Sequence, residues 1–529
     1  MENFRLENYR CFSDTGTLDI KPINLLIGRN SSGKSSLLKF FPLLKQSMRR
    51  HINGVFLWYD ESLVDFKDFN NALKRGAHEM VITLTNDVYS QGQVFKHNSS
   101  LPVRVTTKLT LAPLYSLEAV HADSIVPDYL KKISIEFLGN NIELALSNDA
   151  IPSTKIIDLT INGERINLDE KEYIVAQDIY LPNIIFLDDI NEELGKDEQK
   201  DFQPKSTLGK LRQLLIELNP SEVKLSTHLL IYSFSLYSLD QFRDILGVRS
   251  ESPKIELVKK AHTLYLLHHL DHLFGRVRQQ LAEQSQYIYY IEPLRSVAQR
   301  FYRYQNLTVE QLNPDGSNLP MYLFNLNLYE RDRLNKWLSE HFNFEFEVVS
   351  SGGHFEILIK ESGKKKANLV DVGFGYSQLL PIIVQIWGAI HRRSTSYMDP
   401  SFKESLKFPR IIAIEQPELH LHPRMIGKFA RMLGTIIGFC KTHGLDVRFI
   451  IETHSKTLLE RLGTMIADSS YTEGKEDTQI AELTKDDAQV LLFNNGANEE
   501  ENYIVKSAFD DDGFLTEWPV GFLDEDMDE

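Results

Sequence analysis

Three short runs along the chain have the apolar character of buried strands. Residues Ile23–Ile27, Arg410–Glu415 and Val447–Ile451 are apolar over almost their whole length, which is typical of parallel strands that are covered on both faces. A helix is predicted directly after the first run, over Ser36–Phe40, and another over Leu379–Trp387. Strands that alternate with helices in this way predict an α/β domain.

The middle of the chain follows two other patterns. Polar and apolar residues alternate between Gln91 and about Gln177, with breaks at Gly139–Asn141 and Asn162-Gly163. This alternation predicts antiparallel strands joined by tight turns. After Pro204 the spacing of apolar residues becomes helical, and Ile255–Glu283 repeats it. The first helical series is Leu208, Leu211, Leu214, Leu215 and Leu218.

These patterns predict how the chain is organised. We expect a head built from two discontinuous lobes, residues 1–90 and 345–529. A β-rich insertion is expected over 91–187, a helical arm over 204–285 and a return segment to the head over 286–344. The charged stretch Asp188–Asp201 is expected to be a linker. A chain of 529 residues is long enough for more than one hydrophobic core.

The segment Gly28–Ser35 fits the phosphate-loop pattern G-x-x-x-x-G-K-[ST], and it stands between a strand and a helix, as that loop requires. Its glycines let the backbone turn so that successive N–H groups face phosphates. Lys34 would supply a positive charge for the β- and γ-phosphates, and the Ser35 hydroxyl a ligand for Mg²⁺. The predicted nucleotide-binding residues of this loop are Asn30, Ser31, Ser32, Gly33, Lys34, Ser35 and Ser36.

Functional side chains also follow the two later strands. Glu415 ends one strand and is predicted to hold Mg²⁺ together with Ser35, and His454 follows the other strand. Ligands of open α/β sheets bind at the carboxyl ends of the strands, so His454 is placed to sense a γ-phosphate or an attacking water. The Gly/Ser-rich segment before the second predicted helix indicates a further anion-binding site. Its residues are Gly375, Ser377 and Gln378.

In this order, the phosphate loop, the insertion, the Gly/Ser segment and the two strands resemble the head of the ABC-type ATPases, in the branch that holds SMC, Rad50, RecF and OLD-like proteins. The motifs look closer still to the stand-alone OLD-like ATPases of bacterial anti-phage systems of the Septu, retron and PARIS types. The segments that carry this closer resemblance are Glu415–Pro423, Glu452–Ser455 and Glu517–Phe522.

The resemblance implies a fold, cofactors and residue roles. It implies an ABC-type P-loop head that binds ATP and Mg²⁺ and forms head-to-head dimers, in which Gly375 and Ser377 reach the γ-phosphate held by the second head. His454 matches the switch histidine, and Glu415 the carboxylate beside Mg²⁺. Where these ATPases usually carry a glutamate as general base, this chain has Gln416. We therefore expect slow hydrolysis, with Glu418 or His454 as the substitute base.

Composition limits the location and the partners of the protein. The net charge is −16, the two cysteines are Cys11 and Cys440, and no run of about eighteen apolar residues occurs. We therefore expect a cytoplasmic protein without a signal peptide, a membrane span or a disulfide framework. Acidic residues concentrate at 499–501, 510–512 and 524–526. A solvated surface is the favoured interpretation of these runs, and a docking strip for a basic partner is the alternative.

Several arginines allow two interpretations. They could form a phosphate-contacting surface, interleaved with aromatic residues, or they could pair with the abundant acids. Pairing with acids is favoured, because no glycine-aromatic single-strand motif accompanies them. The residues concerned are Arg276, Arg278, Arg295, Arg300 and Arg303.

Two histidine pairs invite a comparison with metal sites. His268 and His272 lie four residues apart, but no third ligand is evident, so a packed or surface pair is favoured over zinc. His420 and His422 are expected to have structural or interface roles.

These inferences predict an ATP-binding, slowly hydrolysing ATPase that acts as the sensor or regulatory scaffold of an anti-phage complex. It would control a separate effector such as a nuclease or toxin, because the residues after His454 are expected to complete the head. One alternative is a DNA repair or recombination ATPase of the RecF or Rad50 type that binds DNA. Another is a nucleotide-state scaffold with negligible hydrolysis.

Overall fold

The computed structural model describes residues 1–50, 52, 54–88, 102–114, 127–147, 154–170, 172–176, 180–187, 206–218, 230, 234–361, 363–391, 408–472, 483–495 and 502–517. The predicted linker at 188–201, the acidic runs at 499–501 and 524–526 and most of the 517–522 motif lie outside these residues. The chain divides into two compact units. We call one the head unit (Ile20–Lys45, Asp60–Asp65 and Gln284–Glu529) and the other the strand-rich unit (Met1–Asp19, Gln46–Tyr59 and Phe66–Glu283). The predicted domain boundaries stay a prediction.

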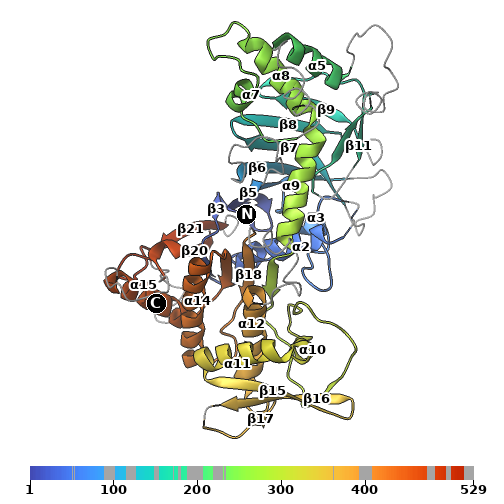
Figure 1. Ribbon diagram of the computed structural model, residues 1–529. Helices are drawn as coiled ribbons and strands as arrows, with labels where there is room; N and C mark the ends of the chain where they lie inside the picture. Colours follow the sequence, from blue (N-terminus) through green and yellow to red (C-terminus); the bar gives the residue numbers. More distant parts are fainter. Residues whose placement is uncertain are drawn as a thin grey trace. The chain divides into compact units, whose positions relative to one another are not determined.

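A largely parallel sheet forms the centre of the head unit (Figure 1). Its strand order is β21 (Asn502–Ala508), β20 (Ala488–Asn495), β4 (Ile23–Gly28), β19 (Val447–Glu452), β18 (Arg410–Glu415) and β13 (Ile288–Ile291). All pairings from β20 to β13 are parallel, and β21 pairs antiparallel with β20. Every residue of β4, β18 and β19 is buried, as expected for strands that are covered on both faces. The three predicted strands and the mixed α/β P-loop fold are confirmed.

Helices pack around these strands. They are α1 (Lys34–Leu38), α2 (Phe40–Met48), α12 (Phe374–His391), α14 (Pro423–His443) and α15 (Lys456–Thr472). The helix predicted over Leu379–Trp387 is confirmed as the middle of α12. Apolar residues surround this helix, and nearly all of its side chains after Tyr376 are buried, which is typical of a core helix. α14 ends at Gly444, whose φ of +65° is the left-handed conformation of a helix C-cap.

A smaller sheet lies in the same unit. Its strands are β14 (Tyr302–Arg303), β16 (His354–Glu361) and β15 (Phe344–Ser351), with β17 (Ala367–Asn368) beside β16. Two helices precede β15, α10 (Leu319–Asn325) and α11 (Leu328–Phe342). Phe346 and Ile357 of this sheet and Leu338 of α11 belong to the same hydrophobic core as α12 and β18. The small sheet therefore extends the core of the head unit.

The strand-rich unit is built on an antiparallel sheet (Figure 1). Its order is β10 (Glu164–Arg165), β9 (Ile156–Ile161), β8 (Asn140–Leu146), β7 (Asp128–Phe137), β6 (Val103–Pro113), β5 (Met80–Val88), β1 (Asn3–Tyr9) and β2 (Phe12–Asp14), with β3 (Leu18–Asp19) beside β1. β11 (Tyr173–Ala176) and β12 (Asn183–Phe186) form a separate hairpin. Positive φ angles at Leu138-Gly139 and Asn162-Gly163 mark two-residue turns. The predicted antiparallel strands are confirmed.

Most helices of this unit follow its strands in sequence, whereas α3 precedes β5. They are α3 (Phe69–Ala72), α5 (Thr207–Leu218), α7 (Leu239–Ile245), α8 (Ile255–His268) and α9 (Leu270–Ser285). The helical spacing predicted after Pro204 and over Ile255–Glu283 is confirmed by α5, α8 and α9. Among the described residues, no helix is both long and apolar enough to cross a membrane.

Asp128, at the start of β7, is a buried carboxylate in the strand-rich unit. It is 3% exposed, and its Oδ2 accepts hydrogen bonds from the backbone N–H groups of Val55 and Phe56, both at 3.2 Å. A Cβ atom on Gly54 would clash with the same carboxylate. Burial raises the pKa of Asp128 to about 6, because the charged form loses its hydration.

The raised pKa predicts a dependence of stability on pH. The folded protein binds this proton more tightly than the unfolded chain, whose pKa is 3.8. The resulting stabilisation is present in full below the unfolded value and is lost as pH rises through about 6. The Asp128→Asn variant lacks this stabilisation, because asparagine does not titrate. The free energy of unfolding of the variant, relative to wild type, should therefore rise between about pH 4 and 6.5, by on the order of 3 kcal/mol. Unfolding of both proteins across this range measures the difference, and a constant value would contradict the assignment.

Candidate functional site

The phosphate loop joins β4 to α1 in the conformation that its sequence predicts. Gly33 has a φ of +100°, a backbone conformation that residues with a side chain rarely adopt. At Gly28, a Cβ atom would clash with the main chain of Phe493 in β20. Glycine is required at both positions. The Lys34 ammonium lies over the loop and donates to the carbonyl oxygens of Gly28 and Arg29, at 2.8 and 2.7 Å. The loop is therefore folded around its lysine.

Glu452 is a site residue that the sequence reasoning missed. It ends β19, is 3% exposed, and its Oε2 accepts a hydrogen bond of 2.6 Å from the Ser35 hydroxyl. Burial raises the pKa of Glu452, while Ser35, Lys34 and Lys39 act in the opposite direction. The sequence does contain a signal for this residue, because Glu452 is a carboxylate at the end of a predicted parallel strand, directly before Thr453 and His454.

Glu415 ends the neighbouring strand β18, at the position paired with Glu452. Its Oε1 accepts a 2.8 Å hydrogen bond from the Tyr290 hydroxyl and lies 3.9 Å from the Lys39 ammonium. Burial raises the pKa of Glu415 to about 7, and the negative charges of Glu452 and Glu292 act in the same direction. Tyr290 and Lys39 were also missed, since they are linked to Glu415 only by the fold.

The turn after β18 carries the other predicted catalytic residues. Gln416 has a φ of +41°, in the left-handed region that favours glycine. Its N–H donates to the Glu452 carbonyl at 2.9 Å. Glu418 accepts from the Thr453 hydroxyl at 2.9 Å and from the His454 N–H at 2.6 Å. These bonds tie the turn after β18 to the turn after β19, and so bring Gln416, Glu418 and His454 together.

The His454 ring has an unused nitrogen. Its Nε2 is buried and has no hydrogen-bond partner among the described residues. Burial, assisted by the charge of Lys34, lowers the pKa of His454, so the ring is neutral near pH 7. A neutral imidazole holds one nitrogen that can accept a proton. Chemically, this nitrogen suits a contact with a water or a phosphate.

The Gly/Ser segment at the start of α12 faces partly inward. Ser377 is buried, and its hydroxyl donates to the Phe374 carbonyl at 2.7 Å. Gln378 is also buried, and Gly375 is half-buried. Phe374 is 47% exposed and lies edge-on to His420, with ring centroids 4.9 Å apart. The predicted reach of Ser377 toward a second head stays a prediction, and it would require the hydroxyl to give up its bond to the Phe374 carbonyl.

The arginines of the predicted phosphate surface have separate environments. Arg300 forms the expected pair with an acid, at 2.6 Å from Asp371. Arg278 donates to the Leu181 carbonyl and to Asn183. For Arg295 the expectation of a surface arginine paired with an acid is wrong. Arg295 is 5% exposed, because its guanidinium turns inward to the end of β18.

The histidine pairs have packing roles. His272 stacks on Phe234, with ring centroids 6.2 Å apart. His422 caps α14, since its Nδ1 accepts from the Arg424 N–H at 3.2 Å. Within the described ranges, no group of three or more acidic, histidine or cysteine residues could hold a metal ion.

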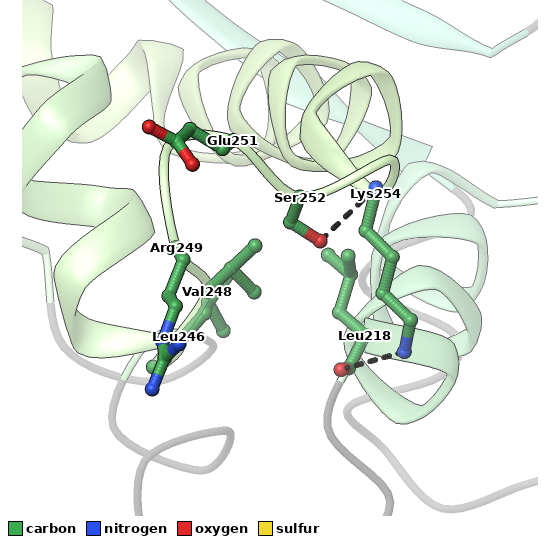
Figure 2. Close-up of a pocket in the computed structure, with 8 residues that line it drawn as sticks. Leu218, Leu246, Val248, Arg249, Glu251, Ser252 and Lys254 are labelled. Carbon is green, nitrogen blue, oxygen red and sulfur yellow. Dashed lines mark hydrogen bonds between the residues drawn. The ribbon is translucent and has the colours of Figure 1, made fainter.

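One cavity of about 490 Å³ lies in the strand-rich unit, between the end of α5 and the turn that joins α7 to α8 (Figure 2). In this view the Lys254 side chain reaches the end of α5, where it donates to the carbonyls of Glu217 and Leu218 at 3.1 and 3.2 Å. Its charge satisfies carbonyls that a helix end leaves free. The residues that line the cavity therefore serve to cap a helix.

The oxygen atoms at the ends of β18 and β19 suit a hard divalent cation. Glu415 and Glu452 present two buried carboxylates at paired positions, and the Ser35 hydroxyl lies against one of them. Mg²⁺ is commonly held by one or two carboxylates together with substrate phosphates. The residues present therefore fit a magnesium ion that is bound with a nucleotide.

The chain is similar to several solved structures. The Smc head domain of Pyrococcus furiosus, bound to the C-terminal domain of ScpA, is 9% identical, with 96% of each chain covered and a TM-score of 0.31. The SMC head domain of Thermotoga maritima is 11% identical, with 95% of this chain and 97% of that one covered and a TM-score of 0.33. A RecF–ATP structure is 10% identical, with 96% and 98% covered and a TM-score of 0.26. Likeness at this level carries no argument about function.

Comparison at the level of families is more specific. No curated protein matches the chain. The family model of the AAA ATPase domain matches residues 1–459. The match includes the phosphate loop, both carboxylate strands and His454, and the chain therefore belongs to the AAA ATPase domain family.

Proposed function

We propose that this protein binds ATP with Mg²⁺ and hydrolyses it slowly, and that the nucleotide state of its head regulates a separate effector. One observation carries the proposal. The phosphate loop and the carboxylates beside it are complete, whereas the first residue after β18 is Gln416, an amide that cannot accept a proton. The site is thus equipped to hold a nucleotide better than to cleave it.

Binding uses the groups already gathered at the loop. The phosphate loop would offer its N–H groups to the phosphates. The Lys34 ammonium, which now donates to the carbonyl oxygens of Gly28 and Arg29, would exchange them for phosphate oxygens, which form stronger charge-assisted hydrogen bonds. Ser35, Glu415 and Glu452 would hold Mg²⁺. When bound, Mg²⁺ would supply positive charge that offsets the negative charge of the phosphates during phosphoryl transfer.

Hydrolysis needs a proton acceptor for the attacking water. The Gln416 amide orients this water, and His454 Nε2 takes its proton, because that nitrogen is otherwise unused. Glu418 is the second candidate, although both of its oxygens already accept hydrogen bonds from Thr453 and His454. Well-placed acid–base groups contribute about a hundredfold to ten-thousandfold to rates. A site without a carboxylate at position 416 is therefore slow, and the ATP-bound state is long-lived.

A long-lived ATP state suits a regulator. In the proposal two heads dimerise around ATP, with Gly375, Ser377 and Gln378 of one head facing the nucleotide of the other. Exposed Phe374 beside them supports a contact surface there. The motif resemblance favours an anti-phage complex in which this dimer restrains or licenses a nuclease or toxin.

DNA repair is the second candidate role. It is favoured only by the arginine-rich segment 295–303, and the burial of Arg295 and the pairing of Arg300 with Asp371 weaken that support. A scaffold with negligible hydrolysis would differ from a slow ATPase in its rate of phosphate release.

Lys34→Ala should abolish ATP binding and leave the fold intact, because it removes the ammonium at the centre of the loop. Titration with a fluorescent ATP analogue measures the affinity, and the melting temperature reports on the fold. Lys336→Ala, which removes an exposed lysine of α11, is the control and should bind normally. Unchanged affinity in Lys34→Ala would disprove the site.

The same variant addresses the cellular role. Cells that express the protein together with its genetic neighbours should resist phage infection, and Lys34→Ala should remove that resistance in a plating assay. Equal plating with wild type, variant and empty vector would argue against the anti-phage role and leave ATP binding unaffected.

Glu452→Gln should weaken the metal site as strongly as Glu415→Gln. Each change removes one carboxylate charge at the paired strand ends, and changes of this kind typically cost about tenfold to a hundredfold in metal affinity. Electron paramagnetic resonance of Mn²⁺, titrated in the presence of a non-hydrolysable ATP analogue, measures the affinity. Glu418→Gln is a matched control, since it also removes one carboxylate charge, and the hydrogen bonds of Glu418 are to Thr453 and His454. Normal Mn²⁺ affinity in Glu452→Gln would exclude a role in metal binding.

Wild-type turnover should lie roughly a hundredfold or more below the value of ~10 s⁻¹ that is typical of enzymes. Gln416→Glu should raise the rate by supplying a carboxylate acceptor, whereas His454→Ala should lower it further. Phosphate release by purified protein, with and without its partner, measures each rate. A wild-type rate of about ten per second would show that the acceptor is misassigned.

A further inference from the structure

Arg295 lies where an exposed segment after β13 turns inward. Its neighbours Leu294 and Val297 are 73% and 67% exposed, whereas Arg295 is 5% exposed. Ser296 anchors the turn, because its N–H donates to the Asp315 carbonyl at 2.8 Å and its hydroxyl to the Asp315 carboxylate at 2.9 Å. Arginine is rarely buried to this extent unless it is paired. The position of this guanidinium therefore calls for a specific reason.

The guanidinium binds the main chain of the Gln416 turn. Its Nη2 donates to the carbonyl oxygens of Glu415 and Gln416, at 3.0 and 3.2 Å. On the other side, the Gln416 N–H donates to the Glu452 carbonyl at 2.9 Å. Gln416 is left-handed, with a φ of +41°, and such a residue keeps this conformation only where its surroundings hold it. The hydrogen bonds from Arg295 stabilise this conformation from one side.

The remaining contacts of Arg295 also involve the site. Nε and Nη1 are buried and have no hydrogen-bond partner among the described residues. Burial lowers the pKa of Arg295 to about 10, and the charge of Glu418 opposes this shift, so the group stays cationic at neutral pH. The Arg295 carbonyl accepts a long hydrogen bond, 3.5 Å, from buried Gln378 at the start of α12. One residue thus contacts both the catalytic turn and the Gly/Ser segment.

We propose that Arg295 is a positioning residue, which holds Gln416 in its left-handed turn and so keeps the amide directed at the attacking water. Arg295 acts through Gln416 and contacts neither the nucleotide nor the water in this role. The inference rests on the proposed ATP hydrolysis, and it adds to that function a residue that is remote in sequence from every motif of the site.

A double-mutant cycle tests whether the effect of Arg295 passes through Gln416. Arg295→Lys keeps the positive charge and shortens the reach. It should lower the single-turnover rate about tenfold to a hundredfold, the cost of a small misplacement, with less than about a threefold change in ATP affinity. In a Gln416→Ala background the same change should have little effect, since coupled residues are not additive. Arg300→Lys, at a neighbouring exposed arginine, should change neither background. Additive losses would overturn the proposal.

Amide hydrogen exchange tests the hold itself, without any need for turnover. In nucleotide-free Arg295→Lys and Arg295→Met, a peptide covering residues 415–421 should exchange faster than in wild type, because the Gln416 and Leu419 N–H groups both depend on this turn. Peptides from α14 should be unchanged, which excludes general unfolding. Unchanged exchange at 415–421 would overturn the proposal. If wild type shows no Lys34-dependent hydrolysis, the proposed function fails, and the exchange result still decides whether Arg295 holds the turn.

Discussion

Two buried carboxylates, those of Glu415 and Glu452, and the half-buried carboxylate of Glu418 are gathered at one edge of the parallel sheet, and hydrogen-bond donors and cations of the site lie around them. Burial of an acid is costly unless it is hydrogen-bonded or paired. Here the donors are hydroxyl groups of Tyr290, Ser35 and Thr453, with Lys34 and Lys39 as the nearby cations. The raised pKa of Glu415, about 7, indicates that this compensation is incomplete. A cation bound together with a nucleotide would complete the compensation of these charges.

The register of two strands explains why these groups meet. Glu415 and Glu452 occupy paired positions of β18 and β19, so the residues that follow them, Gln416 and Thr453, leave the sheet at the same level. Hydrogen bonds then cross between the two turns, from the Gln416 N–H to Glu452 and from His454 to Glu418. These hydrogen bonds connect the end of β19 to the backbone of Gln416. In the proposed function, this connection links the nucleotide contacts near Glu452 to the turn after β18.

The parts of the site that the sequence predicts are those whose chemistry is local. The phosphate loop is contiguous, and Glu415 and His454 are the polar residues at the ends of apolar strands. The missed residues depend on contacts across long stretches of chain. Ser35 and Glu452 are 417 residues apart, and Tyr290 and Glu415 are 125 apart. No local pattern encodes these pairs, because they follow from strand order and register. The sequence also did not predict that Arg295 is buried among exposed neighbours or that the Ser377 hydroxyl points inward. The reason is related, because the direction of a side chain in a turn depends on the packing around it.

The amide at position 416 can be understood from the same electrostatics. A glutamate there would add a fourth carboxylate to an edge where burial already raises the pKa of Glu415, Glu418 and Glu452. Such a group would raise those pKa values further and would repel the phosphates of the nucleotide. Glutamine keeps the size and the hydrogen-bonding capacity of the side chain without the charge. In the proposed function, glutamine in place of glutamate at this position favours retention of ATP over its cleavage, because it removes both the added charge and the proton acceptor.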